Sequence, residues 1–197
     1  LAAFYIDNFS YQENILPKIH KLQGNDVFII ASTETYFENK LIYSESKEYI
    51  NENGIKVKRL SYIKYLPNIF AKKLRLYNDL FKSLVDFHPD IIYLHDCQFL
   101  SIFTIIKYAK NYKVKIIVDS HTDYINSGKS LVSYYILHKL VYKFCAKSIE
   151  KYVTKFWATL PIRKKFLIDV YELNENKIDI LPFGNDDTLY NLSEVEN

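Results

Sequence analysis

Short apolar runs alternate along this chain with longer stretches in which apolar residues recur at helical spacing. Residues 2–6 and 27–31 are apolar runs, and between them Ile15, Leu16 and Ile19 fall on one face of an amphipathic helix. This order predicts a strand, a helix and a second strand.

Both ends of this first helix carry sequence signals. Ser10 and Glu13 have the spacing of a capping box, in which the two side chains satisfy backbone N–H groups of the first helical turn. Gly24 can adopt the left-handed conformation that commonly ends a helix. We therefore expect a helix over residues 10–23.

The rest of the chain continues the alternation. Residues 54–60 alternate apolar and basic positions, as expected of an edge strand or a strand with one buried face. Residues 90–95 and 114–119 are nearly continuous apolar runs, which are typical of strands buried on both faces of a parallel sheet. The other predicted elements are strands at 155–160 and 177–181 and helices at 69–87, 98–111, 131–150 and 161–173.

About seven strands with intervening helices predict an α/β fold with a doubly wound, mostly parallel, Rossmann-like sheet that carries helices on both faces. We assign residues 1–183 to this single domain. Residues 184–197 are polar and aperiodic, and we interpret them as a linker.

Composition and missing motifs exclude several classes of function. The formal net charge of +3 is too small for the concentrated basic field of a nucleic-acid-binding domain. With 4 glycines, the chain has no G-x-G-x-x-G or Walker loop that would hold a dinucleotide or a triphosphate. It also has no D-x-D pair, so we predict neither a bound cofactor nor a metal site.

The cysteines and the apolar runs indicate the cellular location of the protein. Cys97 and Cys145 are far apart and form no C-x-x-C motif, so we expect buried thiols in a reducing cytoplasm. No apolar run approaches the roughly 18 to 20 residues of a membrane span. We therefore expect a cytoplasmic protein.

Parallel α/β sheets bind ligands beyond the carboxyl ends of their strands, which directs attention to the loops at 7–10, 95–96, 119–123 and 183–186. A histidine there can meet a substrate hydroxyl or phosphate while a neighbouring carboxylate fixes its tautomer. The alternative is a loop histidine with a structural hydrogen bond only. The candidate catalytic residues are His121 and, as its orienting group, Asp119, and the candidate binding residues are Asp7, Asn8, Ser10, His95, Asp96, Ser120, Asp123 and Gly184.

Five lysines recur every four residues, at Lys139, Lys143, Lys147, Lys151 and Lys155. On a helix of 3.6 residues per turn they form a slowly spiralling basic stripe. Such a stripe can be attracted to an anionic membrane surface, so peripheral attachment at the inner face of the membrane is one expectation. An ordinary solvated helix face is the alternative.

Taken in order, five segments of the chain resemble the N-terminal domain of family 4 glycosyltransferases, which build capsular and other bacterial polysaccharides. These segments are residues 9–17, 24–27, 89–95, 119–121 and 177–186. The last is similar to the family's I-P-N-G-V-D hinge, with Phe183 and Asn185 in place of the usual Asn and Val. The resemblance extends over nearly the whole chain.

The resemblance implies a retaining, metal-independent hexosyltransferase of GT-B fold, of which this chain is the acceptor-side half. It implies a nucleotide-sugar as co-substrate, a saccharide or lipid-linked acceptor, and inactivity without a C-terminal donor domain that carries the family's E-x7-E acid pair. His121 matches the family's frequent histidine near the reacting sugar. The family's glycine-rich first loop approaches the donor diphosphate, but residues 7–10 contain no glycine, so this contact is unsupported here.

A non-catalytic α/β module that binds a small ligand or a partner protein in the same cleft is the alternative. A reading frame that ends near residue 197 would favour that module. A reading frame that continues into an α/β domain with E-x7-E would favour the enzyme.

Overall fold

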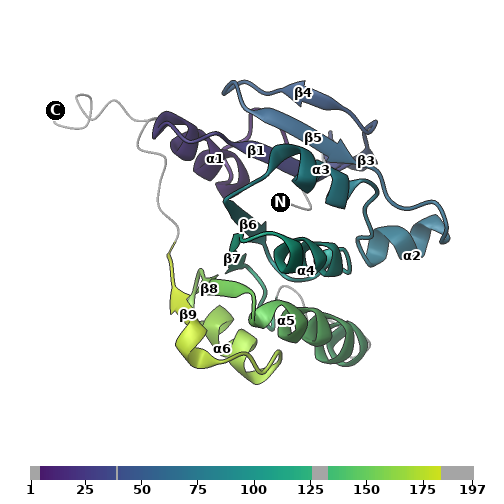
Figure 1. Cartoon of the computed structure of the whole chain (residues 1–197). Coiled ribbons are helices and arrows are strands. Elements are labelled where there is room, and N and C mark those ends of the chain that lie inside the picture. The colour runs from purple at the N-terminus through teal and green to yellow at the C-terminus, as the bar shows by residue number, and fades with distance from the viewer. Residues whose placement is uncertain (1–4, 39, 126–132, 183–197) are drawn as a thin grey trace, which may run out of the picture.

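The computed structural model describes residues 5–38, 40–125 and 133–182, and strands alternate with helices through most of the chain (Figure 1). The predicted α/β class is therefore confirmed. Residues 1–4, which hold most of the predicted first strand, lie outside the described residues, as do the predicted linker and Gly184. Tyr5 and Ile6, at the end of that predicted strand, belong to no strand.

The C-terminal half of the chain builds a parallel sheet of four strands, in the order β6-β7-β8-β9. Figure 1 shows α3, α4 and α5 stacked in this order beside its strands. The strands are β6 (Ile91–His95), β7 (Lys115–Ser120), β8 (Val153–Ala158) and β9 (Ile178–Ile180), and the connecting helices are α4 (Ile102–Asn111), η1 (Ser133–Tyr142) with α5 (Lys143–Glu150), and α6 (Pro161–Asp169) with the short η2 (Glu175–Lys177).

The described strands of the N-terminal half form two smaller sheets. One has the order β1-β5-β4, with β1 and β5 parallel and β4 antiparallel to β5, and the other is the antiparallel pair β2-β3. The strands are β1 (Phe28–Ser32), β2 (Glu34–Phe37), β3 (Lys40–Tyr43), β4 (Glu48–Ile50) and β5 (Lys56–Leu60), and the helices are α1 (Gln12–Leu22), α2 (Asn68–Lys73) and α3 (Leu80–Phe87).

The predicted single sheet of about seven strands is not observed, because the described strands are divided among three sheets. The sequence pattern does not predict β2, β3 and β4, since their side chains are mostly exposed and form no buried apolar run. Of the two alternatives predicted for residues 54–60, the edge strand is not observed, because β5 lies between β1 and β4. The strand with one buried face is observed, since Val57 and Arg59 are buried whereas Lys56 and Lys58 are not.

The predicted helix at 69–87 is divided into α2 and α3. Arg75 and Asp79, between them, have the left-handed φ angles of 52° and 55°, which interrupt a helix. Tertiary hydrogen bonds hold this break: the N–H of Leu100 donates to the carbonyl of Leu74, and the N–H of Tyr77 donates to Ser101 Oγ, both at 2.8 Å.

Of the two sequence signals at the ends of the first helix, one is wrong and one is confirmed. The predicted capping box is wrong, because α1 has Tyr11 as its N-cap and no side-chain hydrogen bond caps it. Gly24 has the expected left-handed φ of 85°, and its N–H donates to the carbonyl of Lys21 at 3.0 Å. The helix ends where the sequence predicts because glycine takes this conformation without a steric cost.

The predicted long helix at 131–150 is described from Ser133 onward, as the π-helix η1 that continues into α5. The five lysines do not form one helical stripe. Lys151 is the C-cap of α5, and Lys155 lies in strand β8. The predicted continuous basic face is therefore wrong.

The main hydrophobic core surrounds the parallel sheet. Ile116, Val118 and Phe156 are fully buried in it. Cys97 and Cys145 belong to the same core as free thiols, and burial raises the pKa of Cys145 to about 12. The expectation of buried cysteines is confirmed.

Arg59 joins the segment before α1 to the N-terminal sheet. The residue is 3% exposed, and its guanidinium donates to the carbonyl of Tyr5 at 2.8 Å and to the carbonyl of Ser32 at 3.3 Å. It also lies 3.3 Å from Asp7 Oδ2, to which the hydroxyl of Tyr49 donates at 2.8 Å. One buried cation therefore holds the segment that leads into α1.

Replacing Arg59 with methionine should lower the free energy of unfolding by about 2–4 kcal/mol, because two carbonyls lose a buried charged donor and the partly exposed Asp7 loses its partner. Lys58→Met is the matched control on the same strand, with a partly exposed ion pair to Glu48, and should cost less than about 1 kcal/mol. Urea denaturation of both variants measures the difference. Equal losses would show that Arg59 has no special role.

Candidate active site

The carboxyl ends of β6 and β7 lie side by side and bring two candidate residues together. In the parallel register, His95 is the partner of Asp119. Neighbouring residues in register point to the same face of a sheet, so the two side chains meet. His121 lies two residues after Asp119, and its side chain turns back toward the Asp119 carboxylate.

The carboxylate of Asp119 lies between the two imidazoles. One oxygen, Oδ2, is 3.1 Å from His95 Nδ1 and 2.9 Å from His121 Nε2. The Asp119 side chain is completely buried, whereas the His121 side chain is 29% exposed and that of His95 is 10% exposed. His121 is therefore the more accessible histidine for a ligand.

The histidines keep this buried carboxylate ionised. Burial alone would raise the pKa of Asp119, but the charge and hydrogen bonds of His95 and His121 hold that pKa well below its usual range. Burial alone would lower the pKa of His121, but the hydrogen bond and charge of Asp119 raise it above the usual value. The cluster therefore favours a negative Asp119 and a proton on His121.

An ionised carboxylate accepts hydrogen bonds and cannot donate them. The two ring nitrogens that face Asp119 must therefore carry hydrogen. This places the proton of a neutral His121 on Nε2 and gives its Nδ1 the lone pair, while a neutral His95 has the lone pair on Nε2. Asp119 thus determines which nitrogen each histidine turns toward a ligand.

The same shifts give the cluster a defined pH dependence of stability. The lowered pKa of Asp119 contributes stability above its unfolded value of about 3.9, and this is lost as the pH falls toward the folded pKa. The raised pKa of His121 contributes stability below its unfolded value of about 6.5, and this is lost as the pH rises through the folded pKa.

Two further residues extend the cluster toward α1. The ring of Tyr93, two residues before His95 on the same strand face, lies 5.2 Å from the His95 ring between centroids. Burial mainly raises the pKa of Tyr93, and the charges of Asp119 and Glu13 add to the shift. Glu13, in the first turn of α1, also helps to raise the pKa of His121.

His95, Asp119 and His121 each offer one ligand atom, and these atoms lie within 4.8 Å of one another. Two imidazoles and a carboxylate form a donor set that zinc and non-haem iron use in proteins. The three residues could therefore hold a metal ion, in a place where the sequence predicts none. In the described geometry, hydrogen bonds to Asp119 already use the facing ring nitrogens.

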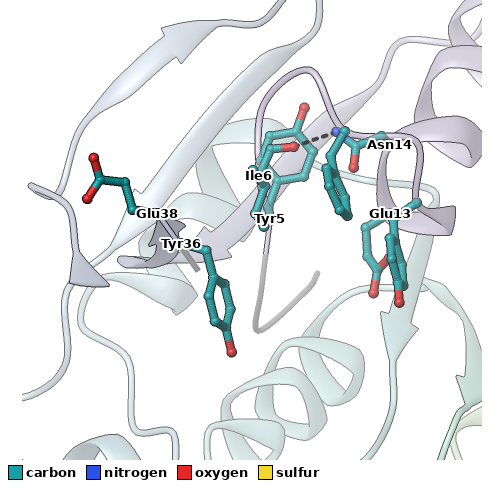
Figure 2. A pocket seen from close by; sticks show the side chains of 8 residues that line it. Tyr5, Ile6, Glu13, Asn14, Tyr36 and Glu38 are labelled. Carbon is teal, nitrogen blue, oxygen red and sulfur yellow. Dashed lines mark hydrogen bonds between the residues drawn. The ribbon is translucent and has the colours of Figure 1, made fainter. Parts of the chain in front are cut away.

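A pocket of about 600 Å³ lies beside Glu13. Figure 2 shows Tyr36 on one side and Glu13 on the other, with Tyr5 and Ile6 between them. The described part of its walls comes from the segment before α1, the start of α1, and the β2–β3 hairpin. The described lining residues are Tyr5, Ile6, Phe9, Tyr11, Glu13, Asn14, Tyr36 and Glu38.

The candidate residues of the first loop have contacts or exposure of their own. Asp7 is held by Arg59 and Tyr49, so its contacts are structural. Asn8 and Ser10 are exposed, and Asn8 has a left-handed φ of 60°. A binding role for these three residues stays a prediction.

The other candidates near the histidines hold the loops in place. Asp96 accepts from the N–H of Cys97 at 2.7 Å and from the Thr122 hydroxyl. Asp123 pairs with Arg163 of α6 at 3.3 Å. Ser120 is buried, and its Oγ accepts from the N–H of Thr122 at 3.4 Å.

The sequence pattern misses several residues of this region. Strand alternation could have identified Tyr93, since it lies two positions before His95 on the same face. Glu13 carries a helix-start signal and no sign of a ligand contact. No sequence signal predicts that Tyr36 of β2 lines the same pocket as the start of α1.

Asp119→Asn should lower the pKa of His121, because the carboxylate is removed while the burial that opposes protonation remains. The measurement is an NMR titration of the histidine ring protons in both forms of the chain. The signal of His20, which is remote from Asp119 in sequence and lies on α1, is the internal control. An unchanged His121 titration would show that Asp119 does not govern its proton.

Comparison with known proteins finds a solved structure with a similar fold. No protein-family model matches the chain, and no curated protein matches it. Among solved structures, the fold is similar to that of a glycosyltransferase from Rickettsia africae ESF-5, with a TM-score of 0.52 and 15% sequence identity. The match covers 93% of this chain and 43% of that chain, so this chain spans less than half of the other's length. The likeness supports a Rossmann-like α/β fold of the kind found in a glycosyltransferase.

Proposed function

We propose that this chain is the acceptor-binding domain of a family 4 glycosyltransferase of GT-B fold. The reaction is transfer of a hexosyl group from a nucleotide-sugar to a saccharide or lipid-linked acceptor in bacterial polysaccharide synthesis. One observation carries the proposal: a buried carboxylate shared by two histidines lies at the carboxyl ends of parallel strands. Ligands of open α/β sheets bind at this edge. Glu13, whose charge acts on His121, lines an aromatic and acidic pocket.

His121 is the proposed catalytic residue, and Asp119 is its positioning residue. In the neutral form, His121 Nδ1 can accept a hydrogen bond from a sugar hydroxyl while Nε2 donates to Asp119. In the protonated form, which its raised pKa favours, the ring can donate to negative charge that develops on a substrate oxygen. Its partial exposure leaves it accessible for such a contact.

The remaining parts of the reaction belong to a donor domain. In this proposal a C-terminal domain holds most of the nucleotide-sugar and the E-x7-E acid pair, so the described domain alone is inactive. Transfer proceeds with retention and needs no metal ion, and no further cofactor takes part. A non-catalytic binding module remains the second candidate, since the same pocket could serve a ligand without any reaction.

His121→Ala in the full-length protein should lower kcat/KM by about 10²-fold or more, the usual contribution of a positioned acid or base. The assay follows transfer from a labelled nucleotide-sugar to acceptor, and His20→Ala on α1 is the matched control. Wild-type transfer should persist in EDTA. An unaltered rate in His121→Ala would contradict the assignment, and loss of activity in EDTA with recovery on zinc would contradict metal independence.

We also propose peripheral contact with an anionic membrane. The support for it is a set of exposed apolar residues, and not the basic stripe predicted from the sequence. No helix in the described ranges is long and apolar enough to cross a membrane. Lys143 pairs with Glu172, which reduces the basic character of this face. Ile136, Leu140 and Phe144 are exposed at four-residue spacing along η1 and α5, and such a stripe can enter a bilayer surface.

Leu140→Ser with Phe144→Ser should reduce co-sedimentation with vesicles that contain anionic lipid several-fold, because the apolar contact is lost. Leu22→Ser, also at a highly exposed leucine, is the control. Absence of wild-type co-sedimentation would rule out the membrane contact, and binding that ignores both the substitutions and the lipid charge would rule out a contact through this stripe.

A further inference from the structure

The pocket beside Glu13 presents aromatic faces. The rings of Phe9 and Tyr11 are stacked with centroids 5.3 Å apart and planes 10° from parallel, and both side chains are about half exposed. Tyr36 lines the opposite wall (Figure 2) and is also about half exposed. Exposed aromatic surface of this kind marks a binding site in a folded domain, and its faces suit the C–H groups of a pyranose ring.

The pocket's charge is negative. Glu13 and Glu38 both line it, and the described residues of the lining include no lysine, arginine or histidine. A carboxylate or phosphate entering it would meet two like charges, with no cation among these residues to offset them. This arrangement disfavours an anionic group.

Glu13 also has a carboxylate oxygen that accepts no hydrogen bond from the described residues. Its Oε2 is buried and has no hydrogen-bond partner among the described residues. A buried acceptor without a partner is unfavourable until a donor reaches it. A sugar hydroxyl that enters the pocket can donate to the carboxylate of Glu13, which lines it, whereas an ionised phosphate or uronate oxygen can only accept.

We infer that this pocket, through Phe9, Tyr11, Tyr36 and the two carboxylates of Glu13 and Glu38, selects an uncharged, hydroxyl-rich sugar residue of the acceptor. The inference rests on the proposed function, since it takes the pocket to be part of the acceptor site. It names the substrate class: the sugar that occupies this pocket carries no acidic group. Any phosphate of a lipid-linked acceptor then lies outside this pocket.

Saturation-transfer NMR on this chain can test the inference with two disaccharides of matched size, cellobiose and cellobiouronic acid. Cellobiose should bind, and its uronic counterpart should bind at least about tenfold more weakly because of the like charges. Glu13→Gln and Tyr36→Ala should each weaken cellobiose binding several-fold. Glu52→Gln, at an exposed carboxylate outside the pocket lining, should leave it unchanged.

Glu38→Lys provides the reverse test, because it should strengthen binding of the uronic disaccharide relative to cellobiose. Tyr36 is exposed, so its truncation keeps the test valid if Glu13→Gln disturbs folding. The inference is overturned if the uronic disaccharide binds as well as cellobiose, if cellobiose does not bind, or if pocket substitutions leave its binding unchanged. Failure of the proposed function is separate: it is the absence of sugar transfer by the full-length wild-type protein.

Discussion

The contact on which the candidate site depends is the carboxylate of Asp119 between two imidazoles. A completely buried charge is costly unless it is paired and hydrogen-bonded, and here His95 and His121 supply both kinds of compensation. The interaction needs β6 and β7 in their observed register, since His95 and Asp119 are partners across it. The chemistry of the site and the order of the parallel sheet therefore depend on each other.

The pocket depends on a second buried charge. Arg59 holds the carbonyl of Tyr5 and the carboxylate of Asp7, and the chain passes from there into the start of α1, where Glu13 lies. One wall of the pocket is thus fixed by the N-terminal sheet, while the histidines come from the C-terminal sheet. Glu13 connects the two, because it lines the pocket and its charge acts on His121.

Much of the C-terminal half could be predicted from the sequence. Its strands are apolar runs buried by helices, so β6, β7 and β8 have clear signals, and strand ends identify His95, Asp119 and His121 as candidates. The pattern fails where tertiary contacts determine local structure. β2 and β3 have no buried apolar run in the sequence, because their side chains are mostly exposed. The helix predicted at 69–87 is interrupted by tertiary hydrogen bonds from the N–H groups of Tyr77 and Leu100.

The geometry of the site could not be predicted from the sequence. A strand-end histidine can be predicted, but two histidines on one carboxylate oxygen require the register of two strands. The structural role of Asp7 required knowledge of Arg59, which is 52 residues away in the chain. The aromatic wall at Tyr36 likewise follows from packing between segments that have no common sequence pattern.

The most direct test is a carbon–proton NMR spectrum of the histidine rings recorded while cellobiose is added to this chain. If Asp119 holds His121 in the acceptor site, the His121 signal should shift with saccharide concentration while the signal of His20 stays in place. A His121 signal that stays unchanged at saturating saccharide would contradict the placement of the acceptor beside this cluster.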